Sequence, residues 1–198
     1  MEKELLFALI STLLLLIGIA PLWRDIIRWR TIPHPFTVWI WSILVFINIY
    51  ILYENKQFVS MIMPVILLIC LTWETIVGSL RRKSISLNWF DYLCLILSVL
   101  CILYLIIYKN LYYTAIFTAI IDFIAILPTF KKSWLQPWTE TAWNFFIWWI
   151  SQLFTVLAMT APDVETMIFW LYVLVIDLIL VIFILSRRYS LKWWKSIF

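Results

Sequence analysis

Apolar residues occur in long runs along the chain, and short polar segments separate these runs. A transmembrane helix needs about 20 predominantly apolar residues to cross about 30 Å of hydrocarbon. Seven runs meet this requirement, and they extend over Leu5 to Leu22, Phe36 to Tyr53, Phe58 to Gly78, Trp89 to Tyr108, Leu111 to Pro128, Thr141 to Ala161 and Thr166 to Ser186. The pattern therefore predicts an all-α membrane protein with seven transmembrane helices.

Composition agrees with this prediction and restricts where function can reside. The 198 residues are 65% hydrophobic and only 13% charged, and the mean hydropathy is +1.01. No polar stretch is long enough to form a separate soluble domain, so we expect the function to lie inside the helix bundle. The first run is interpreted as a helix and not as a signal peptide, because Met1 to Glu4 carries no net positive charge and Pro21 follows Ala20.

Basic residues gather at every second boundary between the apolar runs. They are Arg24, Arg28, Arg30, Arg81, Arg82, Lys83, Lys131, Lys132, Arg187, Arg188, Lys192 and Lys195. The positive-inside rule then predicts an integral inner (plasma) membrane protein with its N-terminus outside and its C-terminus in the cytoplasm. Because the basic residues lie next to helix ends and form no dense arm, we do not expect nucleic acid as a partner. His34, the only histidine, lies between two prolines in the first basic loop and is interpreted as a loop residue.

The chain contains a second copy of its own landmarks at an offset of 107 residues. Pairs at this offset are Ala8 with Ala115, Ser11 with Thr118, Gly18 with Ala125, Pro21 with Pro128, Trp41 with Trp148 and Arg81 with Arg188. Proline, tryptophan and basic residues in one register are harder to obtain by chance than matched leucines. The register predicts an internal repeat.

The predicted repeat has three helices. An odd number of spans ends on the opposite side of the membrane, so a second copy that followed directly would be inverted in the membrane. A linker helix without a counterpart in either copy restores the direction. We therefore predict a 3+1+3 arrangement of parallel triple-helix bundles. Its parts are a first bundle at 1–84, an inversion linker helix at 85–109, a second bundle at 110–188 and a basic and aromatic cytoplasmic tail at 189–198.

The 3+1+3 plan, the outside N-terminus and a proline at the inner end of the first helix of each repeat resemble the PQ-loop superfamily. This group includes SWEET sugar transporters, SemiSWEET proteins, cystinosin-type exporters and KDEL receptors. The second loop, from Pro128 to Lys132, is similar to the PTxxK-type loop of a small bacterial branch. Leu22 follows Pro21 and Thr129 follows Pro128, so the glutamine of the family name is missing from both copies. The resemblance implies a seven-helix transporter fold and leaves the substrate open.

The second helix of each predicted repeat carries a polar stripe around a shared tryptophan. The stripes are Thr37, Trp41, Leu44 and Asn48 in the first copy, and Asn144, Trp148, Ser151 and Thr155 in the second. Polar groups facing lipid lose hydrogen bonds, so these stripes should face protein or a wet cavity. The residues predicted to bind substrate are Trp41, Asn48, Asn144, Trp148 and Ser151. The alternative is that the polar groups bond between helices and the tryptophans only pack.

Three acids, Glu74, Asp122 and Asp177, lie within apolar runs that hold no basic residue at the same depth. A buried charge is costly, so a proton or a cationic group is the expected partner of Asp122 and Asp177. We predict proton coupling at these two positions. A neutral carboxylic acid bonded to a neighbouring helix is the alternative, above all for Asp122, and Glu74 lies near enough to a helix end to reach the interface.

Pro21 and Pro128 remove a backbone hydrogen bond and are predicted hinges. Cys70, Cys94 and Cys101 form no CxxC pair, so neither a metal site nor a cofactor is expected, and no hydrolase, zinc or phosphate-loop motif predicts an enzyme. The favoured function is transport of a small polar solute, a sugar or an amino-acid-like metabolite, by alternating access. A receptor, sensor or accessory subunit on the same scaffold is the alternative. The solute and the lipid bilayer are the expected partners, and a homo-oligomer is compatible with the sequence.

Overall fold

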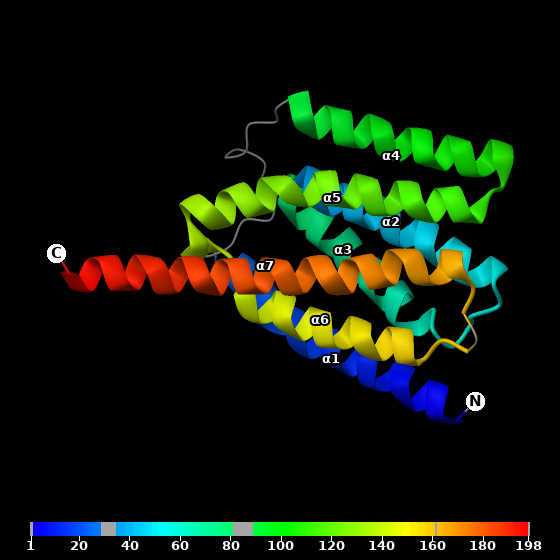
Figure 1. Ribbon diagram of the computed structural model, residues 1–198, viewed down its shortest axis with the longest axis horizontal. Helices are drawn as coiled ribbons and strands as arrows, with labels where there is room; N and C mark the ends of the chain where they lie inside the picture. The colour runs from blue at the N-terminus through cyan, green and yellow to red at the C-terminus, as the bar shows by residue number, and fades with distance from the viewer. Residues whose placement is uncertain (1, 29–34, 81–88, 161, 198) are drawn as a thin grey trace.

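The computed structural model describes residues 2–28, 35–80, 89–160 and 162–197, and every regular element in these ranges is a helix (Figure 1). The elements are α1 (Glu2–Ile27), α2 (Pro35–Glu54), α3 (Ile62–Leu80), α4 (Trp89–Tyr108), α5 (Leu111–Leu135), the short 3-10 helix η2 (Pro137–Thr139), α6 (Ala142–Leu157) and α7 (Val164–Ile197). The prediction of an all-α fold is confirmed. His34 and the basic residues Arg30, Arg81, Arg82 and Lys83 lie outside the described residues.

Four helices are long and apolar enough to cross a membrane. They are Glu2–Ile27, Thr37–Glu54, Leu111–Leu135 and Val164–Leu191. The described parts Ile62–Val77, Leu95–Tyr108 and Ala142–Leu157 form shorter apolar helices. At 1.5 Å per residue, a 16-residue helix such as α6 is about 24 Å long, which is less than the hydrocarbon thickness of about 30 Å.

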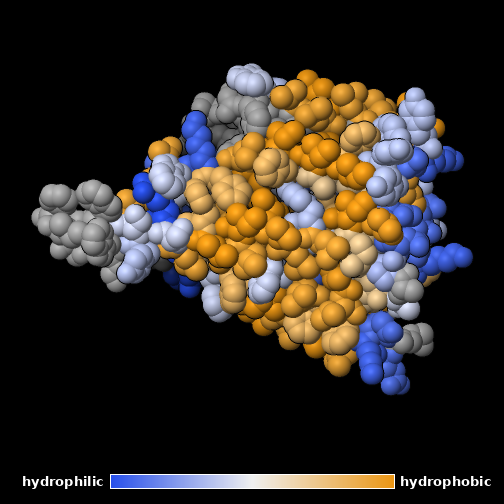
Figure 2. Space-filling view, in the orientation of Figure 1, coloured by the Kyte–Doolittle hydropathy of each residue, from blue (hydrophilic) through white to orange (hydrophobic). Residues whose placement is uncertain are grey.

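The surface has the polarity expected of a membrane protein. In Figure 2 hydrophobic residues cover the middle of the molecule, and hydrophilic residues gather toward its two ends. Large apolar side chains such as Phe46, Ile69 and Ile106 are about 60% exposed, at 59%, 61% and 63%. An apolar belt of this kind is stable in lipid and unfavourable in water.

Three helices begin or end at residues that differ from the bounds of the apolar runs. α5 continues through Pro128 to Leu135, so this proline does not end the helix as the run suggested. α3 begins at Ile62, which places Pro64 in the first turn, where a missing N–H is not needed. α7 continues to Ile197, so the segment 189–198, expected as a separate tail, is helical through Ile197.

The order of packing is the same in the two halves of the chain. α3 lies between α1 and α2, and α7 lies between α5 and α6. Across the halves, α1 packs extensively against α6, and α2 packs against α5. α4 contacts α5 and α2 and lies at the edge of the bundle away from α1 (Figure 1). The first helix of each half therefore contacts the second helix of the other half.

The contact between α1 and α6 is close because its residues are small. A Cβ added at Gly18 would lie 3.0 Å from Ile147 Cγ2. Ser11 donates a hydrogen bond of 2.7 Å to the Ser151 carbonyl oxygen, and Ser151 donates one of 2.8 Å to the Ser11 carbonyl oxygen. The Ser11 and Thr155 hydroxyl oxygens are 2.6 Å apart. These reciprocal bonds hold the two backbones together inside the bundle.

Candidate functional site

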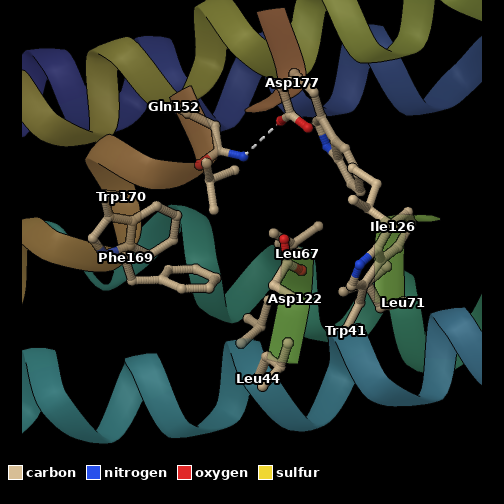
Figure 3. A pocket seen from close by; sticks show the side chains of 13 residues that line it. Trp41, Leu44, Leu67, Leu71, Asp122, Ile126, Gln152, Phe169, Trp170 and Asp177 are labelled. Atoms are coloured by element: carbon tan, nitrogen blue, oxygen red, sulfur yellow. Dashed lines mark hydrogen bonds between the residues drawn. The ribbon is translucent and has the colours of Figure 1, made fainter. Parts of the chain in front are cut away.

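A cavity of about 50 Å³ lies inside the bundle where five helices meet (Figure 3). The lining residues come from α2, α3, α5, α6 and α7, and they are Trp41, Leu44, Val45, Leu67, Leu71, Asp122, Ile126, Trp148, Gln152, Phe169, Trp170, Val173 and Asp177. A water molecule needs at least about 10–15 Å³ of such space, so the cavity has room for roughly three or four. Both halves of the chain contribute to its wall.

Trp41 of α2 and Trp148 of α6 form one side of this cavity. Their ring centroids are 6.2 Å apart and the rings are inclined by 68°, an edge-to-face arrangement that aromatic pairs favour. The two tryptophans that the repeat register paired are thus in contact, and both line the cavity. Such a pair offers flat apolar surfaces and indole N–H groups to a ligand in the cavity.

Two buried polar atoms on the cavity wall have no hydrogen-bond partner. They are the Nε1 donor of Trp148 and the Oε1 acceptor of Gln152, on side chains that are 8% and 5% exposed. Leaving a buried donor or acceptor unpaired costs about 1–3 kcal/mol. A ligand or a water molecule in the cavity could pair with these two atoms and remove that cost.

Asp122 of α5 and Asp177 of α7 enter the cavity from opposite sides (Figure 3). Their side chains are 7% and 6% exposed. The Tyr172 hydroxyl donates a 2.9 Å hydrogen bond to Asp122 Oδ2, and Gln152 Nε2 donates one of 3.3 Å to Asp177 Oδ2. Within the described ranges, the ion pairs join Arg24 to Asp25 and Lys132 to Glu140, and none includes either aspartate.

The two aspartates line the same cavity. Two carboxylates in such a site cannot both remain charged at low cost unless a proton or a cation joins them. The Trp41 indole is a further side-chain donor near Asp122. The arrangement is therefore suited to hold positive charge or to exchange a proton.

Three residues predicted to bind substrate lie outside the lining. Asn48 is 2% exposed and donates a 2.8 Å bond to the Leu44 carbonyl oxygen of its own helix. Ser151 is engaged with Ser11 in the α1–α6 contact. Asn144 is buried, its Oδ1 has no partner, and its carbonyl oxygen would be 3.6 Å from a Cβ at Gly18. Asn48 bonds within its helix and Ser151 bonds between helices, whereas Asn144 Oδ1 has no partner, so substrate binding by these three residues stays a prediction.

Glu74 and the two prolines are also away from the cavity lining. Glu74 is 3% exposed and accepts a 3.2 Å hydrogen bond from Trp23 Nε1 of α1. Instead of reaching the interface, it joins α3 to α1. Pro21 and Pro128 lie inside α1 and α5, where the predicted hinge role stays a prediction.

Sequence reasoning missed Gln152, Tyr172 and the aromatic pair Phe169 and Trp170. Gln152 follows Trp148 by one helical turn, so its spacing pointed to the same face of α6. In the described part of the chain, no group of three or more His, Cys, Asp or Glu residues is placed to hold a metal ion. The carboxyl pair is the charged feature of the cavity.

Comparison with known proteins gave no similarity from which to argue. No family model matches the chain, no curated protein matches it, and no solved structure matches it. The chemistry of the cavity therefore carries the functional argument.

Proposed function

We propose that this protein is a membrane transporter that moves a small polar solute by alternating access between two triple-helix halves. The observation that carries the proposal is the cavity built by both halves, in which Trp148 Nε1 and Gln152 Oε1 have no partner. A solute bound there would contact both halves at once. Motion of one half against the other would then expose it to each side of the membrane in turn.

The packing order supports the predicted 3+1+3 repeat and seven spans. In each half the third helix lies between the first two, and the contacts between halves pair α1 with α6 and α2 with α5. Two copies related by an axis along the membrane normal would produce such crossed pairs. α4 would then be the linker helix, and the resemblance to the PQ-loop superfamily would extend to the fold.

Hydrogen bonds join the two halves at the end that the basic residues predict to face outside. Gln57, between α2 and α3, donates a 2.7 Å bond to the Thr160 carbonyl oxygen and accepts a 2.9 Å bond from the Thr160 N–H. Asn55 donates a 2.8 Å bond to Thr166 Oγ1. At the opposite end, Thr141 and Asp25 are joined across the halves at 3.5 Å. Among the residues that the structure describes, the outer bonds between the halves are the shorter ones, which supports a conformation closed to the outside.

The size of the cavity bears on the class of solute. A cavity of about 50 Å³ favours a compact solute over a hexose, which has about twelve heavy atoms. A sugar would enter only after the halves separate, whereas a compact solute fits the observed arrangement. A compact solute is therefore the better candidate.

The test is uptake by the full chain reconstituted in liposomes, with a panel of labelled small solutes. The double variant Trp41→Ala plus Trp148→Ala should reduce uptake to background, because it removes both indoles from the cavity. The matched control is Trp39→Ala plus Trp143→Ala, on the same helices, whose side chains are 45% and 55% exposed. Uptake that survives the cavity double variant would reject this site, and saturable binding without any uptake would favour a receptor or sensor.

A further inference from the structure

Two carboxyl groups line the cavity without a basic partner from the described residues. Asp122 and Asp177 each accept a hydrogen bond from a neutral donor, Tyr172 or Gln152, and neither forms an ion pair with a described Lys or Arg. A neutral donor compensates a buried carboxylate less well than a cation does. A cationic ligand can take the place of the proton that two such carboxyl groups otherwise need, whereas a neutral ligand such as a diol cannot.

Aromatic rings surround the carboxyl groups. Trp41 and Trp148 are in contact on the cavity wall, and Phe169 and Trp170 also line it, with ring centroids 5.4 Å apart and rings inclined by 83°. In Figure 3, Trp41 lies on one side of Asp122, and Phe169 and Trp170 lie on the other. The faces of aromatic rings attract cations, and the attraction is strongest where water is excluded. Carboxylates and rings thus favour the same kind of ligand, a positively charged organic group.

The two unpaired atoms of the cavity wall, Trp148 Nε1 and Gln152 Oε1, indicate which polar groups the ligand carries besides its positive charge. Gln152 Oε1 requires a donor, which an ammonium group has, while Trp148 Nε1 requires an acceptor, which an ammonium group lacks. The ligand therefore needs an oxygen near its ammonium. The cavity volume of about 50 Å³ favours a compact ligand.

We propose that the solute is a compact organic cation, a primary ammonium with a neighbouring hydroxyl group. The ammonium lies between Asp122 and Asp177 and donates to Gln152 Oε1, while Trp148 Nε1 donates to the hydroxyl oxygen. This inference rests on the proposed function, because it names the solute class of the same cavity. Its test separates binding from transport.

Binding to the purified full chain in detergent at pH 7 is measured by calorimetric titration with 2-aminoethanol, ethane-1,2-diol and glucose. The first two differ only in that a hydroxyl replaces the ammonium group. We expect saturable binding of 2-aminoethanol, and binding of the diol weakened about ten-fold or more by loss of the charged contacts. Equal binding of amine and diol, preferential binding of glucose, or no amine binding would overturn the proposal.

Substitutions of cavity residues test whether 2-aminoethanol binds in the cavity. Asp122→Asn and Asp177→Asn should each weaken 2-aminoethanol binding about ten-fold to a hundred-fold. Asp163→Asn is the matched control, because Asp163 is exposed in the α6–α7 connection and should leave affinity unchanged. Trp148→Phe keeps an aromatic ring and removes the N–H, so it should narrow the affinity difference between 2-aminoethanol and ethylammonium, which lacks the hydroxyl. Unchanged affinity in both aspartate variants would contradict the site.

Folding and transport are measured separately. Each variant is compared with the parent by melting temperature and gel filtration, and the amine-to-diol comparison on the parent holds even if a variant fails to fold. Labelled 2-aminoethanol is then offered to proteoliposomes. Binding without uptake would retain the ligand class and reject transport, whereas uptake of other solutes without amine binding would retain transport and reject the ligand class.

Discussion

Trp41 and Trp148 are 107 positions apart in the sequence and meet edge to face, with ring centroids 6.2 Å apart. One belongs to α2 and the other to α6, so the pair bridges the two halves of the chain. Both rings line the buried cavity beside Asp122 and Asp177. Movement of one half relative to the other would change the geometry of this pair, which makes it a sensitive place to test the proposed function.

The aromatic pair should show energetic coupling. Trp41→Ala and Trp148→Ala each remove the ring–ring contact, so their effects on stability should not add, with a coupling of about 0.5–1.5 kcal/mol. The measurement is a double-mutant cycle from chemical unfolding in detergent. Additive effects would mean that the two rings do not stabilise one another.

Asp177→Asn should change the pH dependence of uptake. In the parent, acidification neutralises the carboxyl groups and weakens attraction for a cation, so uptake should fall as pH decreases. The amide cannot titrate, so the variant should lose part of this dependence, and Asp122 and Tyr172 remain as the other titratable groups of the site. The measurement is uptake across pH at a solute concentration well below half-saturation, where uptake follows affinity, and identical profiles would mean that Asp177 is structural.

Gln57→Ala should weaken the outer contact between the halves. The substitution removes both hydrogen bonds to Thr160, at 2.7 and 2.9 Å, with an expected loss of about 1–3 kcal/mol of unfolding free energy. The melting temperature in detergent checks this loss. Lys56→Ala is the neighbouring control, because the Lys56 side chain is exposed and should cost little.

Ser151→Ala should act on stability and not on solute affinity. Ser151 bonds Ser11 across the α1–α6 contact and does not line the cavity. Hydrogen bonds between membrane helices contribute about 0.6 kcal/mol on average, so the expected loss is of that order for each bond removed. Unfolding and 2-aminoethanol titration of the same preparation check both parts. A large loss of affinity with unchanged stability would mean that Ser151 contributes to solute binding.

The sequence predicted the helices and the central pairings better than the details of the site. Trp41 and Trp148 were singled out because the repeat register pairs them within polar stripes, and Asp122 and Asp177 because a charge within an apolar run is costly. The cavity brings these four residues together. Asn48 lies outside the cavity lining, and its amide bonds the carbonyl one turn earlier on the same helix, which periodicity alone does not reveal.

Other features depended on packing between distant segments. Gln152 was overlooked because it has no polar counterpart at the matching position in the first copy, where Val45 stands. The bond from Tyr172 to Asp122 joins α7 to α5 and has no local signature. The ends of α5 and α7 were set too early, since a helix can continue past a proline and beyond its apolar residues.

α7 carries Asp177 at the cavity and continues without a break to Ile197, beyond the ends of the neighbouring helices (Figure 1). About 30 Å of helix separates these two positions at 1.5 Å per residue. Tilting such a rod by about 10° at Asp177 would swing its far end by about 5 Å. The position of a spectroscopic label near the C-terminus would therefore report small tilts of α7 at Asp177 as displacements of several ångströms.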